Sequence, residues 1–263
     1  MKTIIQVWTH HCYNMPQTGD SNYWGLGDVL RGTIQLYILS KKMGFKLYVD
    51  TSLHPVSKYL EPSENPFSAF IQGNKDKIRM VPANEDLEAQ INRLSEDISF
   101  FFTNAHINGE IDDDCKRFIK NILRPNDTLR KEIKKTVKSD SYNIMHFRLG
   151  DDELVHNIKN IPAYTQNKVL NLIKANKSIN DILMSDSLSL KMNREVLNEI
   201  NVIETIPVHL GRSTDHNSIK DTLIDFFILT TASKIKTYTS YEWISGFVYW
   251  AHKIYDIPLM KME

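Results

Sequence analysis

The sequence of 263 residues predicts an α/β protein with two Rossmann-like domains facing a cleft. Short apolar runs typical of buried strands alternate with segments of helical periodicity, which implies parallel sheets with right-handed crossovers. One run, 143–147, ends abruptly in charged residues and glycine, as expected of a parallel strand covered on both faces. The charged stretch Arg130 to Lys138 separates a predicted domain of residues 1–138 from one of residues 139–263.

Composition excludes several classes of protein. Hydrophobic residues make up 41% and charged residues 24%, which is ordinary globular usage and argues against disorder or a fibre. The 32 basic and 32 acidic residues cancel, so no broad nucleic-acid surface is expected. No apolar stretch approaches the roughly 20 residues of a membrane span. The first strand is too short and too polar to be a signal segment, and with only Cys12 and Cys115 present we expect a cytoplasmic protein.

The expected elements follow from apolar periodicity. In the first half, strands are predicted at the first eight residues, 45–49, 77–81 and 98–103, with an irregular segment at 51–74. Helices are predicted from about residue 30 to Gly44, then at 84–95, 112–123 and 126–138. In the second half, strands are predicted at 142–147, 181–185, near 202 and at 234–238. The helices there are expected at 162–175, 187–200, 218–232 and 241–255.

A glycine-rich loop precedes the first helix. Gly25, Gly27 and Asp28 stand where exposed backbone N–H groups and the helix dipole favour an anion or a close-approaching ligand. The loop lacks the Gly-x-Gly-x-x-Gly spacing of dinucleotide-binding proteins. It therefore predicts a ligand contact without naming the ligand.

Polar residues follow three predicted strands of the second half. Because the carboxyl ends of parallel strands lie at one edge of a sheet, we expect these residues to converge. They are His146, Arg148 and Asp151, then Ser185, Asp186 and Ser187, and finally Thr239 and Ser240. A planar guanidinium suits phosphate oxygens, and hydroxyls directly before a helix also face an anion. Asp186 is the candidate acceptor for a ribose hydroxyl or a base N–H.

Each of these features has a structural alternative. The alternative role of Ser187 and of Ser240 is to cap a helix. The alternative role of Arg148 is to form a structural salt bridge with Asp151 or Asp152. His146 fits a hydrogen-bonded core histidine equally well. Helical spacing favours core packing for the aromatic series Trp243, Phe247, Tyr249 and Trp250. His10-His11-Cys12 resembles a metal-binding cluster but is better explained as part of a loop. Asp112-Asp113-Asp114 also resembles one and is better explained as the start of a helix.

Taken together, these segments resemble the inverting fucosyltransferases of GT-B fold, which include α-1,2-, α-1,6-, Nod-factor and protein O-fucosyltransferases. His146-Phe-Arg148-Leu-Gly150-Asp151 resembles the family's His-x-Arg-Arg-Gly-Asp motif. Met184-Ser185-Asp186-Ser187 is similar to its Ser/Thr-Asp-Asp loop, and Thr239-Ser240-Tyr241-Glu-Trp243 to its Ser-Ser-Phe-Ser-Trp run. Gly25-Leu-Gly-Asp-Val-Leu30 is similar to the family's Gly-x-Gly-Asn/Asp-x-Leu loop. These matches cover about 25 residues.

The resemblance implies a GT-B-like glycosyltransferase that uses a nucleotide-diphosphate-sugar donor, most often GDP-β-L-fucose, and a glycan acceptor. It implies no cofactor and no metal. Arg148 would hold the β-phosphate, Asp186 would lie near the nucleoside, and Thr239 and Ser240 would bind phosphate oxygens. The full set of expected donor contacts is Gly25, Gly27, His146, Arg148, Gly150, Asp186, Ser187, Thr239 and Ser240.

The catalytic residues expected are Arg148, which would stabilise the leaving diphosphate, and a carboxylate that accepts the acceptor proton. Asp28, Asp151 and Glu153 remain alternatives for that carboxylate. Three departures from the family pattern are Leu149 for the second arginine, Ser187 for the second acidic residue and Glu242 for a small hydroxyl residue. They leave open a different nucleotide sugar, such as a UDP-sugar, or a non-catalytic module that binds glycans or nucleotides.

Overall fold

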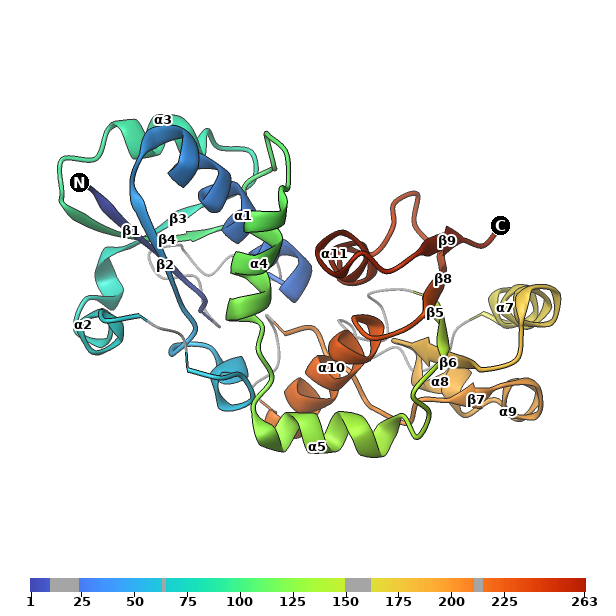
Figure 1. Ribbon diagram of the computed structural model, residues 1–263. Helices are drawn as coiled ribbons and strands as arrows, with labels where there is room; N and C mark the ends of the chain where they lie inside the picture. The colour runs from blue at the N-terminus through green and yellow to red at the C-terminus, as the bar shows by residue number, and fades with distance from the viewer. Residues whose placement is uncertain (10–23, 63–64, 150–161, 211–214) are drawn as a thin grey trace. The chain divides into compact units, whose positions relative to one another are not determined.

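The computed structural model describes residues 1–9, 24–62, 65–149, 162–210 and 215–263 (Figure 1). The described chain divides into two compact units, each built around a parallel β-sheet. Met1–Asn126 form most of the first unit. The second begins at Asp127, so the contacts divide the chain before helix α5 (Asp127–Thr136), whereas the boundary suggested by the charged stretch comes after it. Among the described residues, no helix has the length and apolar character needed to cross a membrane.

The sheet of the first unit has the strand order β2-β1-β4-β3, and all its pairings are parallel. Its strands are β1 (Thr3–Val7), β2 (Lys46–Asp50), β3 (Ile78–Val81) and β4 (Ile98–Thr103). All four coincide with predicted strands within a few residues. Unbroken apolar runs locate them well, because strands of a parallel sheet are buried on both faces.

The helices of the first unit are α1 (Leu26–Met43), α2 (Ser68–Gln72), α3 (Leu87–Asn92) and α4 (Asp113–Ile122), with short 3-10 helices at Pro55–Lys58 and Lys75–Lys77. Helix α1 ends at Gly44, whose φ of 72° is the left-handed conformation predicted for that glycine. Asp112 accepts a hydrogen bond of 2.7 Å from the N–H of Cys115, which confirms the helix-start interpretation of the acidic run. Helix α2 lies in the segment predicted to be irregular.

The sheet of the second unit has the order β7-β6-β5-β8-β9 and is also parallel throughout. Its strands are β5 (Asn143–Arg148), β6 (Asp181–Ser185), β7 (Asn201–Val202), β8 (Lys234–Thr239) and β9 (Leu259–Lys261). The first four were predicted. The three-residue β9 was missed, because so short a run carries no periodicity.

The remaining helices are α7 (Ala163–Asn176), α8 (Leu188–Lys191), α9 (Arg194–Glu199), α10 (His216–Leu229) and α11 (Gly246–Tyr255). The single helix predicted at 187–200 was wrong. It is broken where Asn193 accepts hydrogen bonds from the N–H groups of Glu195 and Val196 and so begins a new helix. The last helix was predicted from residue 241 but begins at Gly246, which leaves 241–245 outside it.

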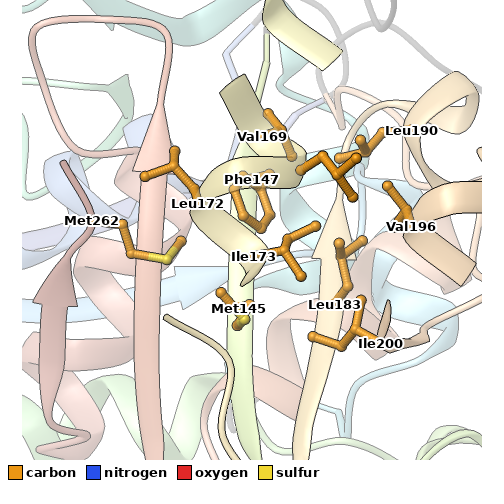
Figure 2. Packing of buried hydrophobic residues seen from close by; sticks show 11 residues of the cluster. Met145, Phe147, Val169, Leu172, Ile173, Leu183, Leu190, Val196, Ile200 and Met262 are labelled. Atoms are coloured by element: carbon orange, nitrogen blue, oxygen red, sulfur yellow. The ribbon is translucent and has the colours of Figure 1, made fainter. Parts of the chain in front are cut away.

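A hydrophobic core lies beneath the central strands of the second unit. Figure 2 shows Val169, Leu172 and Ile173 of α7 packed with side chains of the sheet. The sheet contributes Met145 and Phe147 of β5 and Leu183 of β6, and Leu190, Val196, Ile200 and Met262 complete the labelled cluster. Met145, Phe147, Ile173 and Leu183 are fully buried. The strand that carries His146 and Arg148 is therefore fixed by close packing.

In the first unit, Gly32 allows α1 to lie directly against the end of β4. A Cβ atom at Gly32 would lie 1.8 Å from the carbonyl oxygen of Thr103. This contact is with backbone, which cannot rotate away as a side chain can. Any larger residue must therefore push the helix away from the sheet.

We predict that Gly32→Ala destabilises the protein by roughly 1–3 kcal/mol or more, the usual effect of overpacking. Gly73→Ala is the matched control, since the nearest atom to its new Cβ is the carbonyl oxygen of Phe70 at 3.8 Å. Both changes restrict the unfolded chain similarly, so their difference isolates the clash. Urea unfolding measures it, and equal stabilities would contradict the close approach.

Candidate functional site

The carboxyl ends of β5, β6 and β8 lie side by side, as the sequence predicted. Phe147 pairs with Ser185 of β6, and Arg148 pairs with Thr239 of β8. Because β5 is the middle strand of the three, Arg148 occupies the centre of this edge. In open α/β sheets this edge is where ligands bind.

Arg148 is held by Asp186. Its Nη1 lies 2.7 Å from Oδ2 of Asp186, while Oδ1 of the same carboxylate accepts the backbone N–H of Leu149 at 2.9 Å. The arginine side chain is 17% exposed and the aspartate side chain 7%. Asp151 and Asp152, the partners considered from the sequence, lie outside the described residues. Asp186 thus positions the guanidinium, and its predicted contact with a nucleoside stays a prediction.

The loop after β6 is organised by serines. Ser185 Oγ donates to the carbonyl of Phe147 at 2.9 Å and accepts the N–H of Ser187 at 3.1 Å. Ser187 Oγ accepts the N–H of Leu190 at 3.2 Å and so caps α8, which is the structural alternative for this residue. With 1% of its surface exposed, Ser187 is buried. Capping α8 is a sufficient structural role for Ser187, one that needs no contact with a ligand.

Thr239 and Ser240 connect β8 to the end of β5. The N–H of Ser240 donates to the carbonyl of Arg148 at 3.0 Å, and its Oγ donates to the carbonyl of Leu149 at 3.1 Å. Thr239 Oγ1 accepts the N–H of Tyr241 at 3.2 Å. The prediction that these hydroxyls stand directly before a helix was wrong, because α11 begins only at Gly246. An argument from the helix dipole therefore does not apply to them.

His146 is a core histidine. The residue is 5% exposed, and its Nδ1 lies 3.2 Å from Thr237 Oγ1. Burial, followed by the positive charges of Arg148 and Lys191, lowers the pKa of His146 to about 3. The imidazole is therefore neutral at physiological pH and can act as a hydrogen-bonding group but not as a cation.

A cluster of three buried polar residues in the second unit was missed in the sequence. Lys191 Nζ donates to the carbonyl of Thr205 at 2.7 Å, and Thr205 Oγ1 donates to Asp225 at 2.5 Å. Burial is the largest influence on Asp225 and raises its pKa to about 6, while the charge of Lys191 opposes that rise. The available signal was an acidic residue inside the apolar run 223–229.

In the first unit, the predicted glycine loop leads into α1. Gly25 is the N-cap residue in extended conformation and makes no side-chain cap. Asp28 in the first turn forms a 3.1 Å salt bridge with Arg31, whose Nε donates to the carbonyl of Asn104 at 2.9 Å. Gly27 lies inside the first turn of α1. The remaining predicted site residues, Gly150, Asp151 and Glu153, lie outside the described residues, as does His10-His11-Cys12.

Two parallel sheets in two units, with an arginine at the carboxyl edge of the second, define an α/β protein of GT-B-like fold. No protein-family model matches the sequence, and no curated protein is significantly similar to it. Solved structures do match. The chain is similar to NodZ α-1,6-fucosyltransferase co-crystallised with GDP, with a TM-score of 0.57 and 13% identity over 96% of this chain and 92% of that one.

A second similar structure is fucosyltransferase NodZ from Bradyrhizobium, with a TM-score of 0.56 and 13% identity over 96% of this chain and 93% of that one. A NodZ crystal soaked with GDP-fucose has the same TM-score and identity, over 95% and 91% of the two chains. The predicted α/β, GT-B-like fold class is confirmed. At this identity, the likeness concerns the fold.

We predict that His146→Gln makes the protein less sensitive to acid. A histidine whose folded pKa lies below its unfolded pKa of about 6.5 contributes stability above pH 6.5, and that stability is lost as the pH falls toward 3. Below pH 6.5, His146 should therefore lower the free energy of unfolding of the wild type by up to about 1.4 kcal/mol for each unit by which the pH falls. This loss is absent in His146→Gln.

Urea unfolding between pH 4 and 7 measures the effect, with the exposed His106→Gln as the matched control. Asp225 contributes the opposite slope between its unfolded pKa of 3.8 and its folded pKa of about 6, because its folded state binds the additional proton. That slope is present in both proteins and cancels in the difference. Parallel pH profiles for wild type and His146→Gln would show that His146 titrates normally.

Proposed function

We propose that the protein is a glycosyltransferase that moves a sugar from a nucleotide diphosphate to a glycan hydroxyl, with GDP-fucose as the first candidate donor. The observation that carries this proposal is Arg148 at the carboxyl edge of the second sheet, oriented by the carboxylate of Asp186, whose side chain is largely shielded from water. A guanidinium carries five N–H donors in a fixed plane. Its planar fork matches the oxygens of a diphosphate.

In the proposed reaction, the acceptor hydroxyl attacks the anomeric carbon from the face opposite the diphosphate. One displacement of this kind inverts the configuration at that carbon. Arg148 stabilises the negative charge that develops on the departing diphosphate, which is the main electrostatic task of the transfer. With this charge supplied by a side chain, the reaction proceeds without a divalent ion.

The acceptor proton passes to a carboxylate. Among the described residues, Asp28 is the candidate from the sequence, and its salt bridge to Arg31 fixes its orientation at the start of α1. Asp151 and Glu153 remain alternatives. Such a base contributes about 10²- to 10⁴-fold in rate.

A second candidate is transfer from a different nucleotide sugar. It is favoured by Leu149, which takes the position of the second arginine of the resembling enzymes and packs against the core cluster under β5. A side chain committed to the core cannot contact a donor phosphate. The donor would then be held by one arginine, and its base and sugar would be selected elsewhere.

We predict that Arg148→Ala weakens GDP binding by roughly 10- to 100-fold, since a hydrogen bond to a charged group contributes about 1.5–3 kcal/mol. Arg148→Lys keeps the positive charge but loses the planar fork of donors, so its GDP affinity should lie between those of wild type and Arg148→Ala. Arg79→Ala is the matched control, because Arg79 forms an exposed pair with Glu96. Titration calorimetry on variants shown to be folded measures these affinities, and unchanged GDP binding in Arg148→Ala would refute the assignment.

We predict that the donor preference separates the two candidates. Under the GDP-sugar proposal, GDP should raise the melting temperature more than UDP at equal concentration, because the tighter ligand stabilises the folded state further. Transfer of fucose from GDP-fucose should persist in excess chelator. A clear preference for UDP would indicate that the donor carries a sugar other than fucose. Loss of transfer on chelation would overturn the metal-free mechanism.

A further inference from the structure

The segment between β8 and α11 carries a stacked aromatic pair. The rings of Tyr241 and Trp243 lie 5.0 Å apart between centroids and 12° from parallel. Trp243 is 65% exposed, whereas the other tryptophans are buried: Trp8, Trp24 and Trp250 are at most 9% exposed. Helical spacing assigned Trp243 to the core, and this was wrong because the helix begins three residues later. An indole held against a tyrosine in water needs another explanation.

The pair is attached to the strand edge that holds Arg148. Ser240, the residue before Tyr241, donates its N–H to the carbonyl of Arg148 at 3.0 Å and its hydroxyl to the carbonyl of Leu149 at 3.1 Å. The N–H of Tyr241 is held by Thr239 at 3.2 Å. Three hydrogen bonds thus fix the base of the segment beside the arginine. Stacking on Tyr241 then limits the freedom of the indole, which lowers the entropy cost of binding a ligand there.

We propose that Tyr241 and Trp243 form the platform that binds a pyranose ring of the acceptor glycan, an inference that rests on the proposed function. A pyranose has one face of C–H groups, which packs on the electron-rich face of an aromatic ring. Its hydroxyl groups need hydrogen-bond partners at the rim. Ser240 and Glu242, both exposed and adjacent in sequence to Tyr241, supply them.

The charge of the segment selects the kind of ring. Glu242 places a carboxylate between the two aromatic residues in sequence, and a like charge disfavours a phosphorylated ligand at this position. A carboxylate also accepts hydrogen bonds from neutral hydroxyl groups. The platform therefore fits a neutral sugar in preference to the base of a nucleotide, which would bring its phosphates close to Glu242.

The test uses methyl β-D-galactopyranoside, methyl β-D-glucopyranoside and methyl N-acetyl-β-D-glucosaminide at millimolar concentration with the full chain. Because Trp243 is the exposed tryptophan, acrylamide quenching reports mainly on its indole. A bound sugar should shield it and reduce the quenching slope. Ligand-observed NMR gives the sugar affinity of wild type, Trp243→Ala and Trp243→Phe. Tyr164→Ala, which removes an aromatic residue 75% exposed on α7, is the matched control.

We expect Trp243→Ala to weaken binding of the shielding sugar at least about fivefold, Trp243→Phe to retain most of it, and Tyr164→Ala to change nothing. GDP affinity should be the same in all four proteins. The proposal is overturned if none of the three sugars shields the indole, if Trp243→Ala binds them as wild type does, or if it loses GDP affinity. If wild type fails to bind GDP while a sugar still shields Trp243, the proposed donor is wrong and the sugar platform stands.

Discussion

The carboxylate of Asp186 bridges two neighbouring strands, and the geometry of the candidate site depends on it. One oxygen is 2.7 Å from Arg148 Nη1 and the other 2.9 Å from the N–H of Leu149, so the side chain and the backbone at the end of β5 are fixed together. Both charged groups are largely removed from water, and such a pair is maintained only with good geometry and further hydrogen bonds. The result is a guanidinium that is oriented before any ligand arrives, which reduces the cost of binding a diphosphate.

The hydrophobic core explains why this edge of the second sheet is rigid. Side chains of α7 pack under β5 and β6 (Figure 2). Leu149, directly after Arg148, packs against that cluster. Two buried polar groups of the second unit are neutral or internally bonded: His146 of β5 has a lowered pKa, and Asp225 of α10 accepts a hydrogen bond from Thr205. Arg148 is therefore the side chain through which we expect the edge to act on an anion, while Trp243 extends the same edge with an apolar surface.

The sequence predicted the strands and the convergence of their ends better than it predicted the contacts there. Apolar runs such as 143–147 locate strands of a parallel sheet because burial on both faces leaves a local signal. The pairing of Arg148 with Asp186, 38 positions along the chain, has no such signal. Two helix boundaries failed for local reasons, since Asn193 caps a new helix and 241–245 remain non-helical despite aromatic residues at helical spacing. The same local error assigned Trp243 to the core.

We propose that Asp186 acts on the donor through Arg148, and a double-mutant cycle on GDP binding measures that coupling. Calorimetry would compare wild type, Arg148→Ala, Asp186→Asn and the double variant. We expect Asp186→Asn to weaken GDP binding in the wild-type background but to add little once Arg148 is replaced, which corresponds to a coupling of about 0.5–3 kcal/mol. Fully additive effects, or GDP binding that none of the three variants alters, would contradict it.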